Sequence, residues 1–110
     1  MLTANELEQF TGTENYYRHA FGGKYTDGVA YLAEKAGAYW LLDAIFSYAR
    51  KEPFQVWALA QMPSGHWTLE MREDSDTPIL VRQDIEYSDF PLAKVELWLI
   101  DGVLILPSEY

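Results

Sequence analysis

The hydrophobic periodicity of this chain changes at Pro53, and this change is the strongest constraint on its fold. Before Pro53, apolar residues recur every three or four positions, which is typical of helices. After Pro53, short apolar and alternating runs separated by turn residues are typical of strands in an antiparallel meander. The sequence therefore predicts an α+β fold, with N-terminal helices packed on one face of a five-stranded antiparallel meander sheet. The expected strands are 54–61, 66–72, 78–87, 95–100 and 103–106.

One of the predicted turns has a clear chemical signature. Asp101 and Gly102 stand alone between the last two apolar runs. A type I′ turn needs positive φ at both central positions, and Asp-Gly is one of the pairs that adopt it. The last two strands are therefore expected to form a tight hairpin.

The first half of the chain is predicted to be helical. A short capped helix is expected over 4–10, followed by a turn-rich connector with three glycines over 11–25. A second helical segment covers 26–36, and Gly37 either ends it or allows close packing inside a kinked helix. The next segment, 38–51, is apolar almost all round, which is typical of a helix at the buried centre of a domain.

The whole chain, 1–110, is predicted to be a single domain, with a helical half over 1–52 and an antiparallel sheet half over 53–110. The absence of cysteine excludes disulfides and thiolate metal sites. The N-terminus lacks the features of a signal peptide, and the longest apolar stretch, 36–49, is too short to span a bilayer. A cytoplasmic protein that binds no membrane is therefore the simplest expectation.

Acidic residues are concentrated in the second half of the chain. The net charge is −9, and residues 52–110, with eleven acids and three bases, contribute −8 of it. This charge opposes direct binding to DNA, RNA or anionic membranes, because all three require clustered lysine and arginine. It permits a basic protein partner, or it serves only to keep the fold in solution.

Alternation in the predicted strands also indicates what lies on each face of the sheet. One face is hydrophobic, whereas the other is expected to be polar and mostly acidic, with Trp98 on it. A tryptophan among carboxylates is typical of an interface anchor, unless a loop or the C-terminal tail covers it. The candidate contacts for a partner are Glu70, Asp84, Glu86, Glu96 and Trp98.

The sequence contains no specific catalytic, phosphate-binding or metal-binding motif. The glycines around Lys24 match neither a P-loop nor a dinucleotide fingerprint. The two histidines lack metal-ligand spacing, and the acidic run 73–77 is explained by a turn at a hairpin tip. No cofactor and no metal are therefore expected.

Asp43 is the single charged residue in the apolar segment 38–49. A buried carboxylate needs a partner, and the connector offers Arg18, His19 and two tyrosines. We therefore predict a structural polar cluster of Arg18, His19 and Asp43 that holds the connector against the second long helix. Two alternatives stay open: Asp43 faces water at the edge of the helix, or it acts as a general base in a pocket.

Several phrases of the sequence resemble a known family. The phrases are FTGTENYYRH, KYTDGVAYLAEKAGAYWLLDAI, VRQDIEYSDFPL and DGVLILPSEY, and they extend over 10–110. They are similar to a family of small acidic bacterial proteins of unknown function that is common in plasmids and other mobile elements. This family has no established activity, so the resemblance implies a free-standing domain and a genomic context but no site residues.

The resemblance and the acidic half together lead to a functional hypothesis. We expect a small non-enzymatic protein-binding module whose acidic sheet face meets a basic protein. An inhibitor of a nucleic-acid-binding host defence protein, of the anti-CRISPR or anti-restriction kind that imitates DNA charge, would combine both features. The alternatives are a small hydrolase-like enzyme that uses His19, Asp43 and Arg18, and a structural homodimer.

Overall fold

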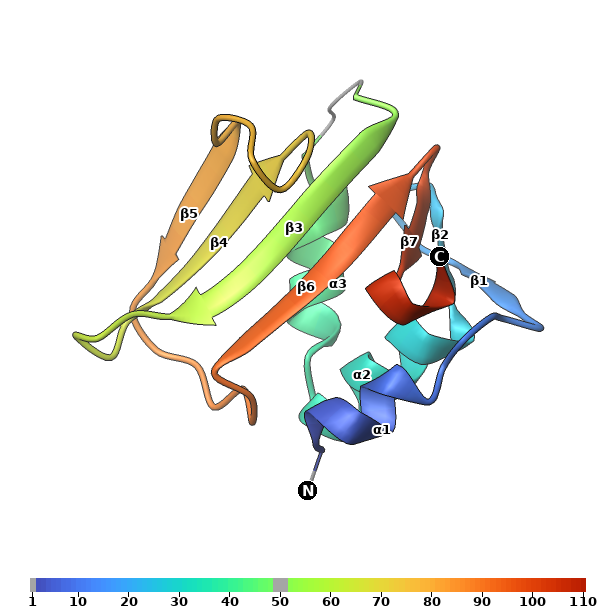
Figure 1. Cartoon of the computed structure of the whole chain (residues 1–110), viewed down its shortest axis with the longest axis horizontal. Coiled ribbons are helices and arrows are strands. Elements are labelled where there is room, and N and C mark those ends of the chain that lie inside the picture. The colour runs from blue at the N-terminus through green and yellow to red at the C-terminus, as the bar shows by residue number, and fades with distance from the viewer. Residues whose placement is uncertain (1, 49–51) are drawn as a thin grey trace.

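The computed structural model describes residues 2–48 and 52–110. In these residues the chain forms three α-helices and a seven-stranded mixed sheet, which confirms the predicted α+β class (Figure 1). The predicted end of the helix over 38–51 falls partly on 49–51, outside the described residues. The elements are, in chain order, α1 (Ala4–Glu8), β1 (Tyr16–Arg18), β2 (Lys24–Thr26), α2 (Asp27–Ala36), α3 (Tyr39–Phe46), β3 (Phe54–Gln61), β4 (Trp67–Arg72), β5 (Val81–Ile85), β6 (Lys94–Ile100), β7 (Val103–Ile105) and the 3-10 turn η1 (Pro107–Glu109).

The sheet has the strand order β1-β2-β7-β6-β3-β4-β5. β3, β4 and β5 form an antiparallel meander, but β6 pairs with the free side of β3 and β7 pairs in parallel with β2. The predicted five-stranded antiparallel meander is therefore wrong in strand number and in the position of β6. The connection 86–93 is longer than a hairpin turn, and it carries the chain past the ends of β4 and β3 (Figure 1).

The predicted connector over 11–25 contains β1 and most of β2, which corrects the expectation of turns alone. All three residues of β1 are exposed, so no alternation of polar and apolar side chains marks it in the sequence. β2 pairs with Val103 and Leu104 of β7, near the other end of the chain. Partners so distant in sequence leave no local pattern, because strand preference depends on the neighbours that the fold supplies.

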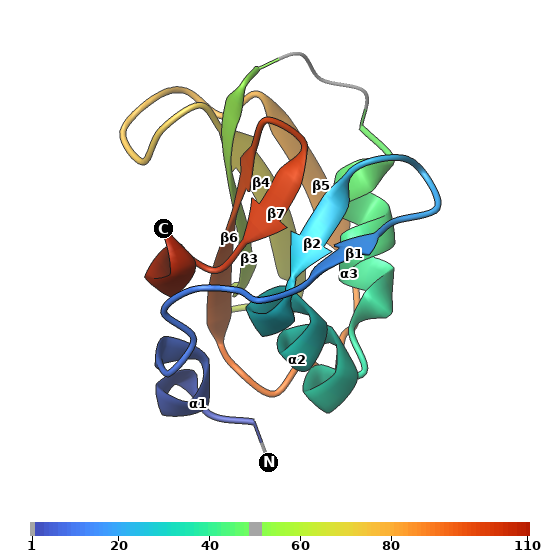
Figure 2. The same ribbon diagram turned by 90° about the vertical axis from the view of Figure 1, so that its right-hand side faces the viewer.

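α2 and α3 lie together on one face of the sheet (Figure 2). The hydroxyl of Thr26 caps α2 by accepting a hydrogen bond from the N–H of Val29, and Gly37 ends the helix with a φ of 61°. The buried side chains of α3 join a single core with apolar residues of β3, β4, β6 and β7. No helix in the described parts of the chain is long and apolar enough to cross a membrane.

Glu109 ties the C-terminal segment to the start of α2. Its Oε1 accepts hydrogen bonds from the hydroxyl of Thr26 at 2.6 Å and from the N–H of Leu106 at 2.9 Å. Its Oε2 accepts from the N–H of Gly28 at 3.2 Å. A carboxylate at this end of a helix is also favoured by the helix dipole. We call this set of contacts the Glu109 clamp, and it brings the two halves of the chain together.

Candidate functional site

The face of the sheet that α2 and α3 leave uncovered is hollowed along β3. Val56, Ala58 and Ala60 form its floor, because they alternate with the core residues of the same strand. β4 and β6 supply the two sides, and Ser75 lines it from the loop after β4, which projects away from α3 (Figure 2). The hollow has a volume of about 330 Å³. We call it the β3 groove.

Two glutamates stand on opposite sides of the middle of the β3 groove. Ala58 pairs with Glu70 of β4 on one side and with Glu96 of β6 on the other. Their Cα atoms are therefore two interstrand spacings, or roughly 10 Å, apart. Ala58 contributes only a methyl group between them, so the space above it is open to a side chain from another molecule.

The charges on this face are balanced, which corrects the prediction of a mostly acidic face. All three cations of residues 52–110 lie here. Sequence alternation could predict which residues point outward, but not that arginines of two neighbouring strands would both pair with Glu70. The charged residues of the strands on this face are Glu70, Asp84, Glu96, Arg72, Arg82 and Lys94.

Glu70 is a partly buried carboxylate of this group, with 20% of its side chain accessible. Its Oε1 lies 3.7 Å from Nη2 of Arg72, and its Oε2 lies 3.8 Å from Nη1 of Arg82. Both contacts are ion pairs without a hydrogen bond, because the two distances exceed the hydrogen-bonding range. Glu96 differs, because its Oε1 accepts a hydrogen bond from the indole N–H of Trp98 at 2.8 Å. Both carboxylates therefore retain the capacity to accept further hydrogen bonds.

Trp98 is half-buried, and the C-terminal tail packs against it. Its ring lies 5.3 Å from the ring of Tyr110 and 5.5 Å from that of Phe54. Of the two alternatives from the sequence, coverage by the tail is the one observed. Trp98 positions Glu96 through the hydrogen bond from its indole, which the sequence did not indicate.

The other two predicted contact residues lie beyond the groove. Asp84 of β5 pairs across the ladder with Thr68 and has an Oδ1 3.5 Å from Nε of Arg82. Glu86 follows β5 and is exposed, without an ion pair or hydrogen bond among the described residues. The structure therefore brings together Glu70, Glu96 and Trp98, while Asp84 and Glu86 lie at the outer edge.

Residues of the site that sequence reasoning missed are Arg72, Lys94 and the floor of the groove. The small residues Ala58 and Ala60 alternate with large ones in the sequence. That alternation is a signal, since small side chains on one face of a strand leave a depression between longer neighbours. Arg72 also donates from Nη1 to the carbonyl oxygen of Thr77 at 2.9 Å, which holds the loop after β4 at the groove.

The structure brings His19 and Asp43 together, while Arg18 lies apart on the exposed surface of β1. Nδ1 of His19 accepts a hydrogen bond from the N–H of Phe21 at 3.0 Å. In the neutral ring the proton is therefore on Nε2, which donates a hydrogen bond to Oδ1 of Asp43 at 2.8 Å. The His19 ring stacks on Phe46 at 4.6 Å, and its side chain is only 8% exposed. Asp43, by contrast, is 61% exposed, so the contact is at the surface.

This geometry opposes a catalytic role for His19. A general base needs a nitrogen lone pair that faces the substrate. The lone pair of Nδ1 is used by a backbone N–H, and Nε2 is used by Asp43. The pair therefore holds the β1–β2 hairpin against α3. Within the parts of the chain that the structure describes, no group of three or more histidine and acidic side chains is placed to hold a metal.

A second carboxylate, Asp27, fixes the segment before β1. Its Oδ2 accepts the N–H groups of Glu14 and Asn15 at 3.0 and 3.1 Å, and its Oδ1 accepts the hydroxyl of Tyr17 at 2.9 Å. Desolvation opposes the charged form of Asp27, but these hydrogen bonds outweigh it and lower the pKa of the carboxyl group. The same contact raises the pKa of the Tyr17 hydroxyl. Of the tyrosines in the connector, Tyr17 therefore binds Asp27 and not Asp43.

Replacement of Asp27 by asparagine is expected to remove one acid-dependent component of stability. Because the pKa of Asp27 is lower in the folded chain, its contribution is present above the unfolded pKa and is lost as the pH falls through the folded pKa. Denaturant unfolding at a series of acidic pH values measures this. Asp76→Asn, which changes an exposed carboxylate with no described partner, is the matched control and should leave the pH dependence unchanged. The same pH dependence of the free energy of unfolding in both variants would refute the role assigned to Asp27.

Comparison with known proteins gives a family but no activity. A model of a family of unknown function, DUF6876, matches residues 1–110. The chain belongs to this family. No curated protein and no solved structure matches it. Membership of DUF6876 confirms the predicted relationship to a family of unknown function, and it assigns no site residue. The functional argument therefore depends on the geometry of the chain.

Proposed function

We propose that this protein is a non-enzymatic binding module that receives a basic segment of a protein partner in the β3 groove. One observation carries the proposal: Glu70 and Glu96 stand on either side of Ala58, above a floor of small side chains. A lysine or arginine side chain that enters above Ala58 would have a carboxylate on each side. Hydrogen bonds to charged groups of this kind are among the stronger polar contacts in proteins.

The surroundings of the groove support the same kind of partner. The loop after β4 carries Glu73, Asp74 and Asp76, and Ser75 of this loop lines the groove. These exposed carboxylates are not paired with cations among the described residues. They add negative potential at the entrance, which speeds association with a cationic partner and makes it sensitive to salt.

The finer hypothesis from the sequence concerns the identity of the partner. A nucleic-acid-binding host defence protein, the target of an inhibitor carried by a mobile element, would present the arginine and lysine side chains that the groove requires. Continuous imitation of DNA charge fits less well, because Arg72, Arg82 and Lys94 interrupt the carboxylates on this face. We therefore propose recognition of individual basic side chains rather than charge mimicry along the whole face.

The two alternatives find less support in the geometry. A hydrolase-like site at His19 lacks a free nitrogen lone pair. A homodimer through the sheet edges would use β1, which has three residues, or β5, which carries Arg82 and Asp84. Short edge strands and charged edge strands oppose pairing with another copy.

Removal of both groove carboxylates should selectively weaken binding of a short arginine-rich peptide. We expect the double variant Glu70→Gln/Glu96→Gln to bind at least about tenfold more weakly, because two charged hydrogen-bond acceptors are lost from a partly enclosed site. Fluorescence anisotropy of the labelled peptide, at fixed ionic strength, gives the dissociation constants. Unfolding curves establish that the variant remains folded.

The matched control is Glu14→Gln/Glu86→Gln, which removes the same charge from exposed positions outside the groove. It should weaken binding by less than about threefold, as expected for screened surface charges. Equal losses in both double variants would mean that net charge alone attracts the peptide. That result, or no binding by the unaltered protein, would overturn the proposal.

A further inference from the structure

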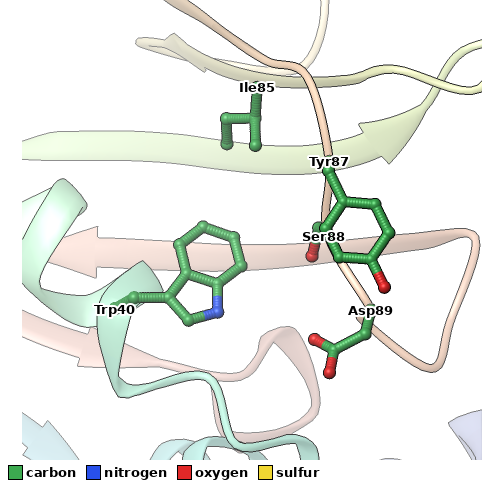
Figure 3. A pocket seen from close by; sticks show the side chains of 5 residues that line it. All are labelled: Trp40, Ile85, Tyr87, Ser88 and Asp89. Atoms are coloured by element: carbon green, nitrogen blue, oxygen red, sulfur yellow. The ribbon is translucent and has the colours of Figure 1, made fainter.

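A second hollow, separate from the β3 groove, lies between the start of α3 and the segment that follows β5. Figure 3 shows its lining: Trp40 from α3, Ile85 from the end of β5, and Tyr87, Ser88 and Asp89 from the connection to β6. Its volume is about 270 Å³. Pockets for drug-sized ligands begin at about 300 Å³, so this one suits a small head group.

The segment that carries three of these residues is held in place at both ends. Ile85 belongs to β5 and packs against the core, and Phe90 is buried at the other end. Between them, the N–H of Phe90 donates to the hydroxyl of Ser88 at 3.1 Å. Trp40 is half-buried and packs against the same core. The backbone of this segment and the sides of the pocket formed by Trp40 and Ile85 are therefore preformed.

Two residues in the pocket have no structural role among the described contacts. Tyr87 is 81% exposed, the highest value among the exposed large hydrophobic side chains. Asp89 is exposed and has no hydrogen bond or ion pair within the described residues. An aromatic side chain so exposed costs hydration free energy without contributing to the core. Both side chains are thus available to a ligand.

We propose that this pocket binds an organic ammonium cation. The chemistry is complementary, because the faces of an indole and a phenol attract a cation and a nearby carboxylate neutralises it. The group would lie against Trp40 and Tyr87, with Asp89 as counter-ion and Ile85 in contact with its alkyl substituents (Figure 3). A single carboxylate is too few oxygen ligands for a metal ion, and Asp89 repels anions.

Choline is the probe for the head group, and 3,3-dimethylbutan-1-ol is its neutral isostere. Choline should shift the indole N–H resonance of Trp40 in NMR spectra, assigned by comparison with Trp40→Phe. The isostere should bind at least about fivefold more weakly, since it has the same shape but no charge. Equal binding of both compounds would overturn the proposal, as would no shift at about 10 mM choline, a tenfold excess over a 1 mM dissociation constant.

Variants test the two exposed residues without disturbing the core. Tyr87→Leu and Asp89→Asn should each weaken choline binding by about two- to thirtyfold. Tyr16→Leu, at an exposed tyrosine of β1 outside the pocket, is the matched control and should bind as the unaltered protein does. Unchanged affinity in both pocket variants would overturn the assignment.

The ammonium group has two possible sources, and a second titration distinguishes them. A short peptide with a trimethyllysine is compared with choline and with the same peptide carrying unmodified lysine. Tighter binding of the trimethyllysine peptide than of choline would assign the site to a modified protein side chain. Equal binding of choline and the peptide would assign it to a free quaternary amine.

Discussion

Replacing Glu109 with alanine is expected to lower the free energy of unfolding by about 2–3 kcal/mol. The substitution removes three hydrogen bonds to a charged acceptor, from Thr26, Gly28 and Leu106. The hydroxyl of Thr26 is buried, so it loses a partner that water replaces poorly. The loss also removes a negative charge from the start of α2, where the helix dipole favours it. Denaturant unfolding measures the change.

Two further variants separate the clamp from a general effect of charge. Glu109→Gln keeps one oxygen acceptor. Its free energy of unfolding should therefore lie between those of the unaltered chain and the alanine variant. Glu73→Ala removes an exposed carboxylate from the loop after β4, and its effect should stay within about 0.5 kcal/mol. A Glu109→Ala effect as small as that of Glu73→Ala would contradict the assigned role of the clamp.

The substitution Gly28→Ala is expected to destabilise the protein by about 1–3 kcal/mol, although alanine favours helices over glycine. A Cβ atom at this position would lie 2.7 Å from Cδ1 of Leu106 and 2.8 Å from the carboxyl group of Glu109. Leu106 is buried, and Glu109 can move away only by breaking the clamp. The close approach of the tail to α2 therefore requires glycine at this position. Thermal or denaturant unfolding measures the loss.

A double-mutant cycle provides the decisive comparison for Gly28. In the Glu109→Ala background the carboxyl group is absent, so Gly28→Ala should cost less than in the unaltered chain, and the part of the cost that comes from Leu106 should remain. Gly12→Ala is the matched control, because a Cβ there meets nothing within 4 Å and its effect should be close to zero. Equal costs in both backgrounds would mean that Gly28 and the clamp act independently.

Features of the fold that depend on neighbouring residues could be predicted from the sequence. Thr26 caps α2 and Gly37 ends it, and both are local signals. Asp101 and Gly102 have positive φ, as the Asp-Gly pair predicts. The strand order could not be predicted in this way, because β6 could pair with either free edge of the meander on its hydrophobic pattern alone. The long connection 86–93 was the one sign that it does not form a hairpin with β5.

The candidate site was predictable only in part for the same reason. Alternation correctly predicted that Glu70 and Glu96 face away from the helices. Their meeting across Ala58 depends on β6 lying beside β3, and in the predicted meander Glu96 would have stood beyond β5. The pairing of His19 with Asp43 was predicted from the burial of Asp43, and that premise is wrong because the Asp43 side chain is 61% exposed. The orientation of the His19 ring depends on the N–H of Phe21, which no residue pattern reveals.

The position of β7 has a consequence for how the protein is made. β7 lies between β2 and β6, yet it is the last of the seven strands to be synthesised. Until residues 103–105 leave the ribosome, β2 has no parallel partner and one edge of β6 is bare. The sheet therefore cannot be completed in the order of translation. A nascent chain stalled before this point would expose unpaired strand edges to chaperones, proteases and other nascent chains.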